Sequence, residues 1–246
     1  MSIIYPLEGL FVPRFESPAE PPLKGIVPHE VCDQLIKIHQ ETGMETDPTR
    51  IDNHTLLFKA PGRVSDGVYT DTKDSTDLFI ASEFIHNAKM IPEEHNHIID
   101  ASLEYYKYLS RSVQKYIKAL EFEDDAAILT MCVPYALRIV NGLLVQHYLP
   151  NQGFKQWHCE RNFRGTMNRE FVFMTYLNDV PNGGTLFYHQ DKCIEAKKGR
   201  TVIWPAHFTH VHKGQITDQH EKYICTGWLG YPPADTRTWL EEEDRV

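Results

Sequence analysis

Residues 171–188 read FVFMTYLNDVPNGGTLFY, and this stretch decides the fold class. Its two ends, 171–177 and 185–188, are rich in aromatic and β-branched residues, which favour β-strands. Between them lie Asn, Asp, Pro and Gly, ending in the turn-forming run 182–184. Two strand-like runs separated by turn residues predict β-structure rather than helix at this point of the chain.

Strand-like runs of the same kind flank this stretch on both sides. They lie at 143–148, 200–204 and 222–228, and a second turn signal at 198–199 precedes the middle one. Several short strands at this spacing are typical of a sandwich or a barrel. The chain after residue 125 is therefore expected to be mainly β.

Before residue 125 the sequence predicts two helices. The first covers 28–42, with Pro28 as its first residue and Gly43 as its stop signal. The second covers 97–120 and carries an apolar stripe at helical spacing. We expect this stripe to pack on the core; its members are Leu103, Tyr106, Leu109, Val113, Tyr116 and Leu120.

Together these elements predict one domain over residues 1–246, with helices packed against a β core. Residues 1–125 are expected to form a helical and irregular support region, because 1–27 are rich in proline and 44–82 carry many turn residues. Residues 126–232 are expected to form the β core. Residues 233–246 are expected to form a solvated acidic tail.

Composition argues against several classes of protein. The formal net charge of −9 argues against nucleic acid as the main partner, because phosphate contacts need Lys and Arg. No apolar run approaches the roughly 20 residues that span a bilayer, and the N-terminus lacks an apolar signal region. The five cysteines are scattered without a CxxC pair, and free thiols suit a reducing compartment. We therefore expect a cytoplasmic protein without a membrane partner.

Two short motifs indicate a metal site. In Trp157-His158-Cys159-Glu160, the histidine and the carboxylate are two residues apart, so an extended chain points both to the same side. About fifty residues later, His210 and His212 each offer an imidazole as a third ligand. Two histidines and one carboxylate form the facial triad of non-haem iron(II) oxygenases, which leaves coordination positions open.

Lys222 adds a third motif, because it lies ten residues after His212 and twelve after His210. With this run, 222–228, the sequence resembles the iron(II)/2-oxoglutarate oxygenase superfamily, and within it the prolyl 4-hydroxylase-like branch. In that family a Lys or Arg about ten residues past the distal histidine binds the far carboxylate of 2-oxoglutarate. The resemblance covers about 140–230 and includes the runs 148–158, 176–187 and 199–205.

The resemblance implies a double-stranded β-helix, or jelly-roll, core with packed N-terminal helices. It implies iron(II), 2-oxoglutarate and O2 as cofactors and cosubstrates, and ascorbate as a reductant that such enzymes can use. The metal ligands would be His158, Glu160 and His212, with His210 as the rival for the third place. The branch usually has Asp where this chain has Glu160, which weakens the transfer of the prolyl substrate class.

The resemblance also implies roles for residues around the metal. Lys222 would pair with the far carboxylate of 2-oxoglutarate, and Tyr148 and Thr185 would donate hydrogen bonds to the same molecule. Trp228 would pack on the cosubstrate or the substrate, or else into the core. Other residues shape the entrance: the loops at about 60–80 and 160–170, with Arg161, Arg164 and Arg169 lining a substrate groove or lying on a solvated loop.

Three functions remain open from the sequence. The first is hydroxylation of a prolyl residue in a peptide or protein, and the second is the same chemistry on a small molecule such as a free amino acid. The third is a non-catalytic β-barrel module that binds metal. Such a module would have no need of Lys222, so the spacing of that residue favours the two enzymes. Neither the substrate nor the oligomeric state follows from the sequence.

Overall fold

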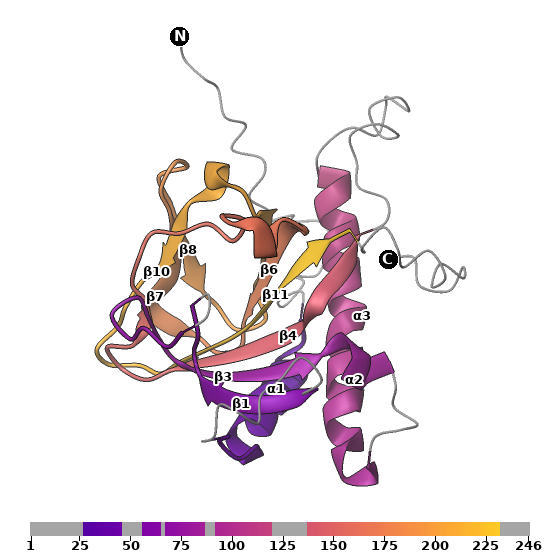
Figure 1. Ribbon diagram of the computed structural model, residues 1–246. Coiled ribbons are helices and arrows are strands. Elements are labelled where there is room, and N and C mark those ends of the chain that lie inside the picture. The colour runs from indigo at the N-terminus through magenta and orange to yellow at the C-terminus, as the bar shows by residue number, and fades with distance from the viewer. Residues whose placement is uncertain (1–26, 46–55, 65–66, 87–91, 120–136, 232–246) are drawn as a thin grey trace, which may run out of the picture.

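The computed structural model describes residues 27–45, 56–64, 67–86, 92–119 and 137–231. Its strands form two main layers, seen in Figure 1 as a large sheet and a smaller one beside it. The expected boundary near residue 125 and the acidic tail lie outside the described residues, so the division of the chain stays a prediction.

The large sheet has six strands, and every neighbouring pair runs antiparallel. Two of its strands come from the region 44–82, where irregular chain is expected; they extend the sheet beyond its core strands. In spatial order the strands are β1 (Leu57–Pro61), β3 (Thr76–Ala81), β4 (Arg138–Tyr148), β11 (Lys222–Gly230), β6 (Arg169–Tyr176) and β9 (Thr201–Pro205).

A three-stranded sheet faces the large one and is built around β7 (Val180–Phe187), with β10 (His212–Gly214) on one side and β8 (Lys192–Ala196) on the other. The predicted turn at 182–184 is wrong, because these residues lie inside β7. Asn182 has a φ of 55°, and the register with β8 shifts between Val180 and Thr185. The Asn and Gly residues therefore accommodate a bulge in the strand rather than a reversal of the chain.

A short third sheet pairs β2 (Lys73–Asp74) with β5 (Gly153–Phe154). Its register sets Lys73 opposite Phe154. The small sheet thereby links the segment before β3 to the loop that carries His158.

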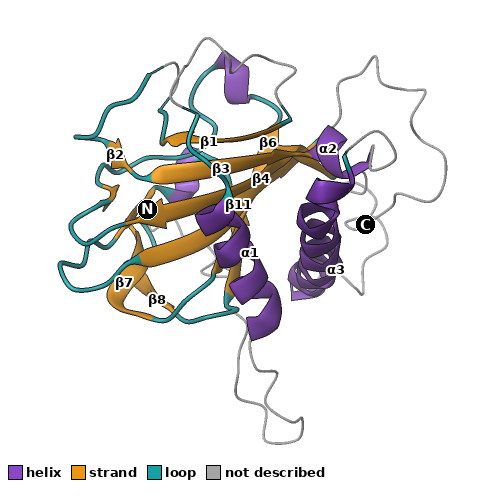
Figure 2. Ribbon diagram, turned by 90° about the horizontal axis from the view of Figure 1, so that it is seen from below, coloured by secondary structure: helices purple, strands orange, loops and turns teal. Residues whose placement is uncertain are grey.

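Helices cover the outer face of the large sheet (Figure 2). The predicted helices at 28–42 and 97–120 are confirmed as α1 (His29–Glu41) and α3 (Asn96–Ala119), and a short α2 (Ser82–His86) follows β3. Leu103 is exposed, so the predicted stripe on α3 is wrong at this position. The buried face of α3 includes Tyr105 in place of Leu103, so an aromatic ring fills this part of the core.

Alternation along β11 separates the two faces of the large sheet. Tyr223, Cys225 and Leu229 pack against the helices, whereas the side chains between them point to the other side. Those inward positions line a cavity: Lys222, Ile224, Thr226 and Trp228. The fold is mainly β with a jelly-roll core and packed N-terminal helices, as expected. None of the described helices has the length and hydropathy needed to cross a bilayer.

Candidate metal centre and its cavity

A pair of backbone hydrogen bonds joins the two segments that carry the predicted ligands. His158 N donates to His212 O at 3.0 Å, and His212 N donates to His158 O at 2.9 Å. An extended strand was expected at His158 and Glu160. The two residues lie instead in a loop after β5, where His158 forms only an isolated bridge. This isolated bridge sets both side chains beside the start of β10.

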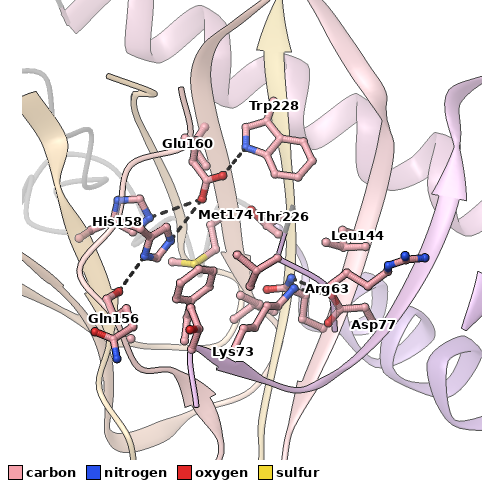
Figure 3. Close-up of a pocket in the computed structure, with 18 of the residues that line it drawn as sticks. Arg63, Lys73, Asp77, Leu144, Gln156, His158, Glu160, Met174, Thr226 and Trp228 are labelled. Carbon is pink, nitrogen blue, oxygen red and sulfur yellow. Dashed lines mark hydrogen bonds and ion pairs between the residues drawn. The ribbon is translucent and has the colours of Figure 1, made fainter. Parts of the chain in front are cut away.

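The ligand atoms of His158, Glu160 and His212 lie within 4.8 Å of one another. Glu160 Oε1 is 3.4 Å from Nε2 of His158 and 3.7 Å from Nε2 of His212. Figure 3 shows His158 and Glu160 converging on one side of the pocket. In the described part of the chain, no other three metal-ligating side chains come together in this way.

Backbone contacts orient both imidazoles. Nδ1 of His158 lies 3.0 Å from Gln156 O, and Nδ1 of His212 lies 2.9 Å from His210 O. A carbonyl oxygen accepts, so in each ring Nδ1 carries the proton and donates. The lone pair of each Nε2 is then directed at the shared centre, which is the usual arrangement of a metal-ligating histidine.

The protonation states also suit a metal. Burial by itself raises the pKa of a carboxyl, but hydrogen bonds and charges from His158 and His212 hold the pKa of Glu160 well below its usual range. Burial lowers the pKa of His212, which disfavours the charged form of that ring. A carboxylate and two imidazoles whose Nε2 atoms face one point are the donor set that iron(II) takes in a facial triad, so the residues present fit the metal.

His210, the rival for the third place, is not part of this group of converging side chains. Residues Phe208–His210 form a turn of 3-10 helix, and β10 begins only at His212. The turn rotates the side chain of His210 away, so that Nδ1 contacts the Thr209 hydroxyl at 3.0 Å. Burial lowers the pKa of His210 to about 4.

Lys222 is buried in the same cavity, with a relative exposure of 5%. Its ammonium donates to the backbone oxygens of Gln215 at 3.1 Å and Gly183 at 3.3 Å. No described carboxylate lies within ion-pair distance of it. Burial lowers the pKa of Lys222 to about 8. A buried cation without an anionic partner fits the carboxylate of a 2-oxo acid.

The two hydroxyl groups expected to contact 2-oxoglutarate are both in the cavity wall and both already paired. Tyr148 donates to Gln146 Oε1 at 2.7 Å, and Thr185 shares a hydrogen bond of 2.6 Å with the Tyr176 hydroxyl. The ring of Tyr148 also lies beside Lys222, whose ammonium is 5.2 Å from its centroid. The aromatic wall thereby helps to exclude water around the cation.

Arg169 and Trp228 lie behind Glu160. The guanidinium of Arg169 covers the Trp228 ring at 3.5 Å, and its Nη1 lies 3.4 Å from Glu160 Oε2. The indole N–H of Trp228 is also directed at Glu160 (Figure 3). Trp228 therefore contacts a proposed ligand. The expectation of a solvated loop is wrong for Arg169, which begins β6 and packs its guanidinium on the Trp228 ring. Arg161 pairs with Glu170 at 2.7 Å, and Arg164 is exposed.

The cavity has a volume of about 460 Å³ and lies between the two main sheets. Both loops expected to shape its entrance contribute to the wall. The wall also contains three polar side chains that sequence reasoning missed: Lys73 of β2, Asp77 of β3 and Gln146 of β4. The loop contributions are Arg63, Val64, Thr72, Lys73, Asn162, Phe163, Thr166 and Arg169.

Comparison with known proteins agrees with this geometry. Residues 143–230, which hold most of β4 and all elements to β11, match the model of the 2OG-Fe(II) oxygenase superfamily. No curated protein matches the chain in sequence.

Among solved structures, a prolyl hydroxylase from Trichoplax adhaerens in complex with a hypoxia inducible factor peptide fragment has a TM-score of 0.55 at 14% identity, covering 91% of this chain and 84% of that one. A prolyl-4-hydroxylase from Pseudomonas putida has a TM-score of 0.52 at 14% identity, covering 90% and 92%. The viral collagen prolyl hydroxylase of Paramecium bursaria Chlorella virus-1, in a 2OG complex, has a TM-score of 0.51 at 15% identity, covering 85% and 94%.

At 14–15% identity, the similarity to these structures shows the fold alone. The superfamily match over 143–230 confirms the oxygenase resemblance that the motifs around His158 and Lys222 predict.

Proposed function

We propose that this chain, a 2-oxoglutarate-dependent dioxygenase, hydroxylates a prolyl residue in a peptide or protein, with iron(II) held by His158, Glu160 and His212. The observation that carries the assignment of the ligands is the convergence of both Nε2 atoms on Oε1 of Glu160, at 3.4 and 3.7 Å. A buried lysine, Lys222, lines the same cavity and has no carboxylate partner among the described residues, so its charge is available to a cosubstrate carboxylate.

Each of these residues has a defined task in that reaction. When bound, iron(II) and 2-oxoglutarate supply the chemistry that inserts one atom of O2 into a C–H bond, with succinate and carbon dioxide as the other products. Glu160 provides the negative charge of the site, and the two imidazoles provide neutral donors with fixed orientation. Lys222 binds the far carboxylate of the cosubstrate.

The prolyl substrate is supported by the walls of the cavity and its rim. Trp157 and Phe163 both line the cavity and are exposed at its edge. Aromatic side chains that flank a groove are a common means of docking proline-containing segments, because the proline ring packs on an aromatic face without losing much conformational freedom. The solved structures with the same fold carry the names of prolyl hydroxylases.

A second candidate is the same chemistry on a small molecule such as a free amino acid. The volume of the cavity, about 460 Å³, favours it, since pockets of roughly 300 to 1,000 Å³ suffice for small ligands. The two candidates differ in what must enter the cavity: a side chain on a longer segment, or a whole molecule.

The two candidates can be separated by supplying both kinds of substrate to the iron-loaded protein. A set of proline-containing peptides and a set of free amino acids are each incubated with 2-oxoglutarate and O2, and succinate is measured. We expect a prolyl peptide to stimulate turnover and to gain one oxygen atom on proline, as seen by mass spectrometry. Stimulation by free amino acids alone would reject the prolyl assignment and favour the second candidate.

A further inference from the structure

A buried ion pair between Lys73 and Asp77 lies in the wall of the cavity, outside the metal group and the lysine assigned to the cosubstrate. Lys73 is 4% exposed and Asp77 is 7% exposed. Figure 3 shows both on the side of the pocket away from His158 and Glu160. Burying an ion pair costs desolvation energy that can exceed the attraction between the two charges. A buried pair in the wall of a cavity is therefore better explained by ligand binding than by stability.

The carboxylate of this pair is fully engaged by the protein. Oδ1 of Asp77 accepts from the Ser75 hydroxyl at 2.8 Å, and Oδ2 accepts from the Lys73 ammonium and from Gln146 Nε2 at 3.4 Å. Gln146 in turn accepts the hydroxyl of Tyr148 at 2.7 Å. Asp77 therefore has little capacity left to receive a proton donor from a ligand.

The ammonium of Lys73, unlike the carboxylate of Asp77, has hydrogen-bonding capacity left for a ligand. It carries three N–H donors, and within the described residues its acceptor is Asp77. The remaining donor capacity sits on a side chain that lines the cavity. The site thus offers hydrogen-bond donors and calls for an acceptor atom.

Charge decides which kind of acceptor fits. The Lys73 and Asp77 charges cancel, so a buried carboxylate bound here would bring an uncompensated negative charge. A carbonyl oxygen accepts the same hydrogen bond without adding charge. Lys222 differs, since it has no carboxylate partner among the described residues and suits an anion. The two buried lysines of the cavity therefore suit different ligand groups.

The register of the small sheet connects this donor to the loop that carries His158. Lys73 pairs with Phe154 across the β2–β5 sheet, and the Phe154 ring stacks on the His158 ring at 3.6 Å between centroids. Lys73 and His158 therefore face the same cavity from either side of the Phe154 ring. In a prolyl peptide the proline nitrogen has no proton, so its neighbouring amide carbonyls are the groups that can meet a donor.

We propose that Lys73, held by Asp77, binds a backbone carbonyl oxygen of a peptide substrate and positions the target residue at the metal centre. This inference rests on the proposed function and makes it more specific: it assigns the substrate to the peptides, by a neutral acceptor, and not to free amino acids.

The test combines a change in the protein with a change in the substrate. The protein change is the double substitution Lys73→Met and Asp77→Asn, which removes both charges together and leaves no unpaired ion. The substrate change replaces the carbonyl next to proline by a thioamide, a weaker acceptor, in an N-acetylated and C-amidated peptide. Lys155→Met is the matched control, because Lys155 is a partly exposed lysine beside Asp74 at the same small sheet.

With the parent protein and with the Lys155→Met control, we expect the thioamide to raise the KM of the peptide by about ten-fold. With the double variant, we expect the KM of the ordinary peptide to rise by a similar factor and the thioamide to have no further effect. The dissociation constant of 2-oxoglutarate reports whether the variant is folded, and we expect it to change by less than about two-fold. The thioamide comparison on the parent protein does not depend on the folding of any variant.

The outcomes separate the two proposals. A prolyl peptide that is hydroxylated equally well by the double variant, or with a thioamide, would overturn the role of Lys73 and leave the proposed function standing. A blocked peptide without proline that shows the expected losses would support the role of Lys73 and reject the prolyl assignment. Turnover with free amino acids alone, or with no member of the set, would reject both.

Discussion

The indole N–H of Trp228 donates a hydrogen bond of 3.1 Å to Oε2 of Glu160, the oxygen that is not shared with the two histidines. Oε1 faces both imidazoles, and Arg169 reaches Oε2 as well, at 3.4 Å. One oxygen is therefore left for a metal while the other is held by the protein. The resembling branch usually has the shorter Asp at this place, and the two donors give the longer Glu160 side chain a single orientation.

The first prediction concerns this hydrogen bond. Trp228→Phe keeps an aromatic ring under Arg169 but removes the N–H, so Glu160 loses part of its support. We expect metal affinity to fall by about ten-fold, as is usual when a group that orients a metal ligand is removed. Calorimetric titration with Ni(II) under anaerobic conditions measures the effect.

The matched control for this experiment is Trp157→Phe. Trp157 is adjacent to His158 in sequence, but its ring lies against Tyr188 and Lys213 instead of the triad. The affinity of the Trp157→Phe variant for Ni(II) should equal that of the parent protein. Equal losses in both variants would mean that the indole of Trp228 acts through general packing and not through Glu160.

The second prediction concerns the cosubstrate. Lys222→Met retains most of the buried aliphatic side chain and removes the charge. We expect the dissociation constant of 2-oxoglutarate to rise by about a hundred-fold, while metal affinity stays the same, because a charged hydrogen bond in a buried site is lost. Lys213→Met, a change on the neighbouring β10, serves as the control. Normal binding of 2-oxoglutarate by the Lys222→Met protein would show that Lys222 does not bind the cosubstrate.

The third prediction follows from the pKa of the same lysine, which burial lowers to about 8. Below this pH the side chain is charged and can bind a carboxylate; above it the free protein loses the charge. Affinity for 2-oxoglutarate should therefore be constant at lower pH and fall as pH rises through about 8, by up to about ten-fold per pH unit. Titrations of the Ni(II)-loaded protein across this range measure it.

The control for the pH dependence is Lys222→Arg. A guanidinium keeps its charge throughout this range, so the decline above pH 8 should disappear in this variant, whatever its absolute affinity. If the arginine variant shows the same decline, another group is responsible for the pH dependence.

The fourth prediction separates the two candidate histidines. His212→Ala should abolish stoichiometric metal binding, whereas His210→Gln should retain it, because the contact between His210 and His212 uses the backbone oxygen of residue 210. Metal content after dialysis against iron(II), together with the melting temperature of each variant, tests this. Retained binding in His212→Ala with loss in His210→Gln would reverse the assignment.

The sequence carried much of the metal site because the ligands lie in short motifs. His158 and Glu160 are two residues apart, and Lys222 follows His212 at a characteristic distance. The choice between His210 and His212 depended on the backbone conformation. The sequence His210-Val211-His212 does not reveal that a 3-10 turn ends at His210 and that β10 begins at His212. The composition and spacing of the strand-like runs predicted a sandwich or a barrel, and the jelly-roll core was implied by the family resemblance. The bulge inside β7 looked like a turn, because Asn and Gly are common in both.

What the sequence could not reveal depends on distant contacts. Trp228 and Glu160 are 68 residues apart, and nothing local indicates that they meet. The run from Lys73 to Asp77 reads as a polar turn, and its burial follows only once β3 is seen to pair with β4, with Asp77 opposite Gln146. The domain boundaries and the cytoplasmic location stay predictions.

The central claim is a single centre at which His158, Glu160 and His212 hold iron(II) and Lys222 binds 2-oxoglutarate. The most direct measurement is an anaerobic titration of the iron(II)-loaded protein with 2-oxoglutarate, followed by its visible charge-transfer absorption. We expect a saturable band in the parent protein, no band in His158→Ala, and a band that requires much higher 2-oxoglutarate in Lys222→Met. Iron that is bound without any band in the parent protein would contradict the claim.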